Sequence, residues 1–258
     1  MQVDHRGPVA LIHFGNPEDR SRWSHEEETA YFDRLVALEA DPTVRVMVLT
    51  GASADFCAGP ELDSLTSPAE RDPRGDDFPR TVAKPLIAAI DGGCHGIGLS
   101  LALMCDLRVV SASTRMSAGF ASVGLVAEHG VPWLLQRICG HGTAADLLLT
   151  DRRIDGEEAW RLGIAQYLAD EGTTALDHAL ALAATMARRL SPLSLGVIKH
   201  QLNAECVGDA HDTVVRGEHL VQRITGPGDF SEAMTALREG RRPTPAALDL
   251  AVLRDVLA

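Results

Sequence analysis

An α/β fold followed by a more helical region is the class that this sequence predicts. In the first half of the chain, short β-branched or apolar runs alternate with helical patterns, which is typical of α/β proteins. Helical patterns dominate after residue 130, and we interpret them as a lid or as an element of assembly. We therefore expect a core that spans residues 1–190 and a helical C-terminal region that spans residues 191–258.

Three strands and one helix are predicted before residue 91. The helix begins after Ser24, a residue type that caps helix N-termini, and runs to about Ala40. The polar segment 66–78 contains Pro and Gly, and we expect it to be the most mobile part before residue 150. Alternating or continuous apolar residues predict strands at Pro8–Phe14, Val44–Thr50 and Leu86–Ile90.

Further elements follow residue 91. The segment Gly92–Cys105 begins with glycines and continues as an apolar helix, and short strands are predicted at Leu107–Val110 and Arg115–Ser117. The later helical patterns lie at 141–149, 173–190, 192–206, 210–225 and 229–239, and the chain closes with the apolar segment Leu248–Leu257.

The composition predicts a globular protein with an acidic surface. The 258 residues are 45% hydrophobic and 23% charged, and their formal net charge is −12. Such a surface repels nucleic acid and anionic membranes, so we expect neither as a partner. The chain shows no signal-peptide pattern and no run of about 18 apolar residues. Five cysteines without CxxC spacing predict a reduced, cytoplasmic compartment, and no Cys/His/Asp spacing suggests a metal site.

Three segments carry the most informative motifs. Each contains small residues or glycines close to a polar residue. The segments directly follow a predicted strand or lie around the start of a helix. They are Phe56–Leu62 (FCAGPEL), Ala89–Asp106 (AIDGGCHGIGLSLALMCD) and Phe120–Glu128 (FASVGLVAE).

In order and spacing, these segments resemble motifs of the crotonase (enoyl-CoA hydratase/isomerase) family. The family's counterparts read F-C-A-G-A-D-L, then A-x-N-G with a glycine-rich turn and A-x-x-C-D, then F-x-x-x-G-L-x-x-D. The resemblance covers almost the whole chain. It implies a spiral of β-β-α turns that assembles as a homotrimer or a dimer of trimers. It also implies acyl-CoA or a related small molecule as substrate, with no cofactor beyond the substrate's own coenzyme A.

The resemblance also implies an oxyanion hole, in which two backbone N–H groups stabilise the enolate formed from the thioester. Carried over by position, the first donor is Pro60, which has no N–H, and the second is Ile97. Gly96 lets the backbone approach a ligand at a helix start. Ala58 and Gly59 directly precede the first donor position. The two-donor hole is therefore absent or rebuilt, unless Pro60 only stiffens a loop.

The acids of the family's hydratases are also replaced. Their two glutamates map to Ser100 and Gly124, so a two-carboxylate hydration mechanism is not expected at those positions. Glu128 instead occupies the place where ring-opening and dienoyl-type isomerases of the family carry an Asp. A single carboxylate that moves a proton between carbons is the isomerase pattern. The alternative for Glu128 is a helix N-terminal acid favoured by the helix dipole.

Four further residues are candidates for the site. His129 follows Glu128 directly and His95 lies in the glycine-rich turn, so both are candidate catalytic groups as well as candidate structural histidines. Arg20 and Arg22 lie where the family often places a basic residue near the coenzyme A phosphates, or else they form a solvated turn.

Three functions follow from these residues. The first is an acyl-CoA enzyme of the hydratase/isomerase type that is more isomerase-like than a two-glutamate hydratase. The second is a coenzyme A-independent hydrolase of C–C bonds in cyclic diketones, for which Pro60, Ser100 and Gly124 are easier to accept. The third is a family member without catalysis, kept for binding or assembly.

Overall fold

The computed structural model describes residues 1–15, 17–19, 21–60, 72–190, 192–204, 215, 222 and 229–241. Within these ranges, the strands form a six-stranded sheet in the order β1-β2-β3-β4-β6-β9 and a three-stranded sheet in the order β5-β7-β8. The main-sheet strands are β1 (Gln2–Arg6), β2 (Val9–Phe14), β3 (Val46–Gly51), β4 (Leu86–Ile90), β6 (Leu107–Val110) and β9 (Tyr167–Leu168). Those of the smaller sheet are β5 (Gly93–His95), β7 (Arg115–Ser117) and β8 (Ile154–Asp155).

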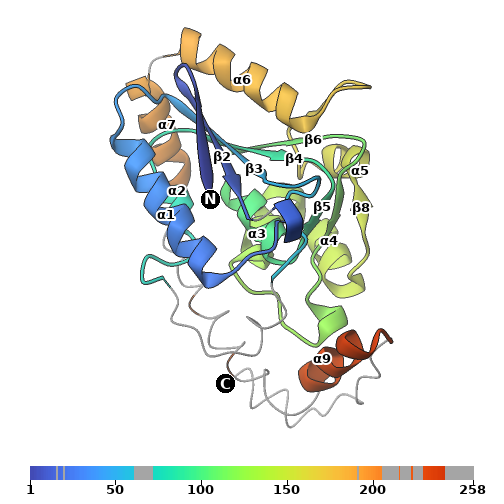
Figure 1. The fold of residues 1–258 in the computed structure, drawn as a ribbon. Helices are drawn as coiled ribbons and strands as arrows, with labels where there is room; N and C mark the ends of the chain where they lie inside the picture. Colours follow the sequence, from blue (N-terminus) through green and yellow to red (C-terminus); the bar gives the residue numbers. More distant parts are fainter. Residues whose placement is uncertain are drawn as a thin grey trace.

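Helices surround the two sheets (Figure 1). The longer ones before residue 160 are α1 (His25–Ala40), α3 (Ile97–Met104) and α4 (Val131–Thr150). Those that follow are α5 (Gly156–Arg161), α6 (Ala175–Arg189), α7 (Pro192–Ala204) and α9 (Asp229–Glu239). The described residues also form three short helices, η1 (Pro17–Asp19), α2 (Phe78–Thr81) and η3 (Ala121–Val123).

Two consecutive stretches of the chain repeat one pattern. In each, a strand of the main sheet is followed by a strand of the smaller sheet and then by a helix, giving β4-β5-α3 and β6-β7-α4. Apart from the antiparallel pair β1–β2, neighbouring strands of the main sheet are parallel. The expected spiral of β-β-α turns is therefore confirmed, and with it the α/β class.

Both faces of the main sheet are buried. On one face, every fourth residue of α6 is a buried alanine, from Ala175 through Ala187, and this stripe packs against Val9, Val48 and Ile87. The opposite face belongs to the larger core, to which α1, α3 and α4 contribute side chains, and Figure 1 shows α6 on the other side of the sheet from α3. The strands of a sheet that is buried on both faces have continuous apolar sequences, and this explains the sequences of β3 and β4.

Most predicted elements are present near their expected bounds. Ser24 caps α1 as expected, because its side chain accepts a hydrogen bond from the Glu27 N–H at 3.2 Å. The predicted helix at 141–149 is only the second half of α4, which includes a non-helical Gly140 (φ 79°, ψ 160°). The prediction missed β1, β5, β8, α5 and β9, which are short or begin with glycine.

Two helices of the expected C-terminal region can be placed. α7 contacts α2 through two hydrogen bonds of 2.9 Å between Arg80 and Asn203. α9 packs Phe230 and Met234 against Val123, the last residue of η3. The pattern at 210–225 lies outside the described residues except at 215 and 222, and Leu248–Leu257 lies wholly outside them. The division at residue 190 stays a prediction.

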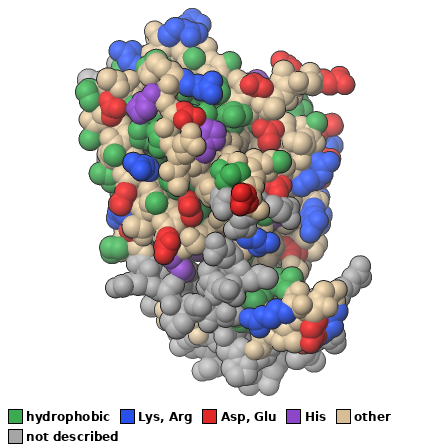
Figure 2. Space-filling view, in the orientation of Figure 1, with side chains coloured by type: hydrophobic (Ala, Val, Ile, Leu, Met, Phe, Trp, Pro, Cys, Tyr) green, Lys and Arg blue, Asp and Glu red, His purple; other side chains and the backbone are tan. Residues whose placement is uncertain are grey.

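The described surface mixes charges of both signs. On the face in Figure 2, Lys and Arg side chains are interspersed with Asp and Glu and do not form one basic patch. No helix in the described part of the chain is long and apolar enough to cross a membrane.

Candidate functional site

Two loops lie side by side where α3 begins. The segment after β3 pairs with β5, because the Cys57 N–H donates to the Gly93 carbonyl at 2.9 Å and the His95 N–H donates to the Cys57 carbonyl at 3.0 Å. The same segment is paired on its other side, where the Trp23 N–H donates to the Gly59 carbonyl at 3.1 Å. The loops that carry the two candidate oxyanion positions are thus brought together.

The helix α3 fits tightly against the first loop. A Cβ atom on Gly98 would lie 2.7 Å from the Cβ of Cys57 and 2.9 Å from its carbonyl oxygen, so this position requires glycine. The N-cap Gly96 has φ 57° and ψ −117°, and Ile97 is the first helical residue. N–H groups in the first turn of a helix have no partner within it and lie at its positive end. The Ile97 N–H can therefore serve as a donor to a ligand.

Pro60 lies in the first loop and is held there by Arg22 and Trp23. Its carbonyl accepts a hydrogen bond from Arg22 Nη1 at 3.0 Å, and its backbone pairs with that of Trp23. The guanidinium of Arg22, a candidate for phosphate binding, thus donates to the loop that carries Pro60. Arg20, the other candidate, lies outside the described residues. Ala58 and Gly59 belong to the same loop, and Gly59 has φ 107°.

Glu128 and His129 lie in a tight turn that precedes α4. The Val131 N–H donates to the Glu128 carbonyl at 3.1 Å, and the two central residues have positive φ, 54° at His129 and 70° at Gly130. Positive φ at both central positions is the feature of a type I′ turn. Glu128 is only 8% exposed, and its Oε1 lies 3.6 Å from His129 Nε2.

The other ring nitrogen of His129 reaches a third residue. His129 Nδ1 lies 2.8 Å from Oδ2 of Asp76, which is 53 residues away in the sequence. Burial lowers the pKa of His129, but the nearby Asp76 and Glu128 outweigh it and raise that pKa to about 10. His129 therefore carries a proton on both nitrogens at neutral pH and is a donor there, not a general base.

Ser100 and Gly124 have structural tasks at the positions of the missing acids. The buried Ser100 hydroxyl donates to the His129 carbonyl at 3.0 Å, so it fixes the turn that carries Glu128. Gly124 takes a left-handed conformation (φ 73°) where η3 ends. The contacts of Ser100, Glu128, His129 and Asp76 form one connected group, which we call the Glu128 cluster.

His95 makes its described contacts elsewhere. Its Nδ1 lies 2.9 Å from the hydroxyl of Ser117 on β7, and a Cβ atom on Gly93 would lie 3.2 Å from its Nε2. The Ser117 contact joins β5 to β7. The described contacts of Glu128 lead to His129 and through that ring to Asp76. The catalytic role of His95 stays a prediction.

Asp76 was not singled out from the sequence. It belongs to the polar segment 66–78, which reads as a mobile loop. Its described part is anchored by Arg74, which pairs with Asp72 and Asp33 and stacks on two phenylalanine rings. The only signal in the sequence was the density of acidic residues, which cannot tell a solvated side chain from a buried one.

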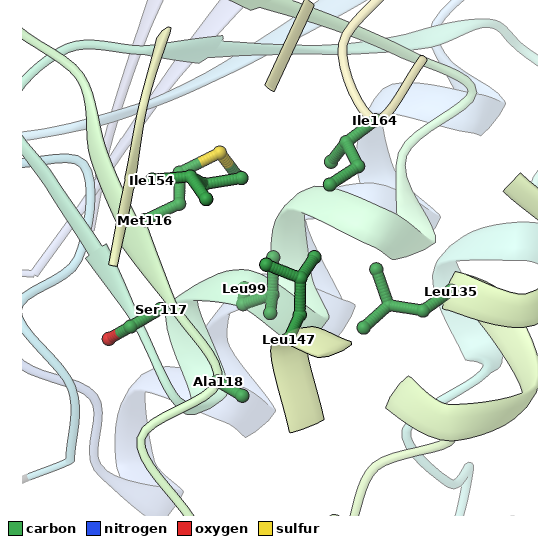
Figure 3. Close-up of a pocket in the computed structure, with 8 residues that line it drawn as sticks. All are labelled: Leu99, Met116, Ser117, Ala118, Leu135, Leu147, Ile154 and Ile164. Carbon is green, nitrogen blue, oxygen red and sulfur yellow. The ribbon is translucent and has the colours of Figure 1, made fainter. Parts of the chain in front are cut away.

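A small, partly open space lies beside Leu99 of α3 (Figure 3). Its volume is about 10 Å³, enough for about one water molecule. Its lining residues are apolar apart from Ser117, whose hydroxyl points away from the space. This space is a gap in the packing between α3, α4 and the smaller sheet, and it does not include the Glu128 cluster. Among the described residues, no group of three or more His, Cys, Asp or Glu side chains could hold a metal ion.

Comparisons with known proteins agree on one family. The sequence model of the enoyl-CoA hydratase/isomerase family matches residues 4–245. A Thermus thermophilus protein assigned as an enoyl-CoA hydratase is 34% identical over 94% of this chain and 99% of its own length. The 1,2-epoxyphenylacetyl-CoA isomerase of Escherichia coli is 29% identical over 91% and 94%. A crystal structure of an enoyl-CoA hydratase/isomerase from Pseudoalteromonas atlantica superposes with a TM-score of 0.87 at 26% identity, covering 95% and 99%.

Proposed function

Because the chain belongs to the enoyl-CoA hydratase/isomerase family, we propose that it is an isomerase-type member of that family, acting on a coenzyme A thioester with Glu128 as the proton carrier. The observation that carries this proposal is the burial of the Glu128 side chain, whose Oε1 lies 3.6 Å from Nε2 of the His129 ring. The positions at which the family's hydratases hold their two acids are Ser100 and Gly124 here, and Ser100 is used to hold the turn.

The proposed reaction moves one proton within the substrate. Glu128 removes a proton from a carbon next to the thioester carbonyl, and the electron pair moves onto the carbonyl oxygen as an enolate. The Ile97 N–H at the start of α3 stabilises that oxygen, because a preorganised donor in a water-poor site favours developing charge. In a 3-enoyl thioester the electron pair then shifts through the neighbouring double bond to the γ-carbon, where it forms a C–H bond with the proton that Glu128 returns. The double bond moves into conjugation with the carbonyl, and the substrate gains and loses no atoms.

Two findings support an isomerase over a two-carboxylate hydratase. The second carboxylate that the structure brings to the site is Asp76, and it is engaged by His129 Nδ1 at 2.8 Å. A relative at 29% identity carries the name of an isomerase, the Escherichia coli protein that acts on 1,2-epoxyphenylacetyl-CoA.

The replacement of Glu128 by Gln tests the proposal. Two probes report on it: uptake of deuterium from D₂O at the α-carbon of phenylacetyl-CoA, and conversion of trans-3-hexenoyl-CoA to its conjugated isomer. Glu128→Gln keeps the size of the side chain but removes proton transfer, so both rates should fall by about 10²–10⁴-fold. The exposed Glu171, changed to Gln, is the matched control and should leave both rates unchanged.

A loss of less than tenfold in Glu128→Gln, with thioester binding intact, would remove Glu128 from this role. Pro60 favours the second candidate, a coenzyme A-independent hydrolase of cyclic diketones, because that chemistry has no thioester oxygen for the loop to bind. Turnover of a cyclic 1,3-diketone in the absence of coenzyme A, together with no deuterium uptake by phenylacetyl-CoA, would establish that candidate instead.

A further inference from the structure

We propose that Asp76 and His129 are positioning residues, in which Asp76 holds the His129 ring and the ring holds the Glu128 carboxylate where it meets the substrate. This inference rests on the function proposed above for Glu128. It assigns a task to Asp76, a residue on a loop that lies outside the three motifs of the family.

Three separate constraints act on residue 129. Its backbone has φ 54°, a conformation that a non-glycine residue keeps only where the surrounding structure imposes it. Its carbonyl accepts from the buried Ser100 on α3, and its ring is bound by Asp76 from the segment before α2. A turn whose only task was to start α4 would need none of these side-chain contacts. The structure instead specifies the place of the imidazole.

Asp76 is itself held firmly. Arg74 donates to Asp72 through Nε at 2.7 Å and pairs with Asp33 on α1 at 2.8 Å. Its guanidinium carbon lies 5.4 Å from the ring centroids of both Phe32 and Phe78. The loop is thereby fastened to α1 on one side and to α2 on the other, and Asp76 is directed at His129 between them.

The geometry explains what the pair does for Glu128. A ring bound at Nδ1 cannot rotate without breaking that hydrogen bond, so Nε2 stays on the side of Glu128, 3.6 Å from Oε1. The groups that face His129 are Asp76 from the loop, Glu128 from its own turn and the uncharged Ser100 from α3. If Asp76 loses its charge, the ring loses its anchor and Glu128 loses a fixed partner.

The experiment compares four loop or turn variants with the wild type, using the two thioester probes above. In Asp76→Asn and His129→Gln, kcat should fall roughly 10–100-fold while KM changes less than threefold, because a misplaced proton carrier slows the chemical step and leaves binding intact. Asp76→Glu keeps the charge and should recover a part of the lost kcat. Asp77→Asn is the matched control, because it removes the neighbouring acid of the same loop, whose side chain makes no capping hydrogen bond to α2, and it should retain kcat within threefold.

A spectroscopic readout accompanies the kinetics. With ¹⁵N-labelled histidine, the His129 ring should give the signals of a doubly protonated imidazolium at pH 7.5 in the wild type and lose them in Asp76→Asn. Should Asp76→Asn fail to fold, the wild-type spectrum and Asp76→Glu still decide the matter, since a neutral His129 in the wild type overturns the proposal.

The two proposals fail in different ways. If Glu128→Gln abolishes both reactions while Asp76→Asn and His129→Gln stay within twofold of the wild type, the positioning role is wrong and the function stands. An equal loss in Asp77→Asn also overturns it, because the effect would then belong to the loop as a whole. If Glu128→Gln is fully active, the function proposed for Glu128 falls and the positioning role falls with it.

Discussion

At the scale of single residues, Pro60 is the departure whose consequence is easiest to measure. It is held by Arg22 and Trp23, at the position where the family resemblance places an N–H donor. Proline cannot donate there, so Ile97 is left as the carried-over donor. One missing donor of an oxyanion hole typically costs about 10²–10³ in rate.

Pro60→Ala restores an N–H at this position. If the enzyme forms a thioester enolate, the turnover of trans-3-hexenoyl-CoA should rise, because the second donor becomes available. Stability should fall by about 0.4–1 kcal/mol, because alanine leaves more freedom to the unfolded chain. Steady-state kinetics and thermal unfolding report the two effects separately. Lower stability with no gain in thioester turnover would favour the diketone hydrolase.

At the scale of elements, the fit of α3 against the segment after β3 sets where the Ile97 N–H lies. Gly98 is the contact point, because a Cβ atom there would lie 2.7 Å from Cys57 Cβ and 2.9 Å from the Cys57 carbonyl oxygen. The neighbouring atom at 2.9 Å is backbone and is itself part of a strand pairing. Neither atom can move without moving the site.

Gly98→Ala should therefore destabilise the protein by about 1–3 kcal/mol, the usual cost of overpacking. Gly142 is the matched control: it lies within α4 and a Cβ atom there would meet nothing within 4 Å. Gly142→Ala should stabilise the protein by about 0.5–1 kcal/mol, because glycine is a poor helix former. Urea unfolding measures both. Equal effects of one sign would contradict the packing account.

At the scale of the whole molecule, assembly into a homotrimer or a dimer of trimers stays a prediction. Apolar side chains on the described surface are consistent with it: Leu149 is 81% exposed, Leu202 is 70% exposed and Leu237 on α9 is 46% exposed. Exposed apolar residues of this kind are commonly covered by partner subunits.

We expect light scattering at micromolar concentration to give three or six chain masses. A charged substitution such as Leu202→Glu should lower that mass if this side of α7 is covered, and the exposed Glu171→Gln should not. A wild-type monomer at micromolar concentration would defeat the assembly prediction. The cytoplasmic location that the cysteines suggest likewise stays a prediction.

The sequence by itself determined the class of fold and most of its elements. Ser24 and the helix it caps, the apolar runs of β3 and β4 and the glycine-rich start of α3 are local features, and local backbone preferences with hydrophobic spacing encode such features directly. The motifs likewise pointed to Glu128, because it stands at a fixed distance from a recognisable glycine. The neighbouring His129 followed from the same motif.

Only the tertiary structure decided what surrounds Glu128. Asp76 and His129 are 53 residues apart, and their contact depends on how Arg74 fastens a polar loop between α1 and α2. No local pattern distinguishes an acid that is buried against a ring from one that faces water. The same holds for β5, whose three residues become a strand because they pair with β7 and, at Cys94, with Cys57. Pairings over such distances are fixed by packing, and packing exists only once the whole chain has folded.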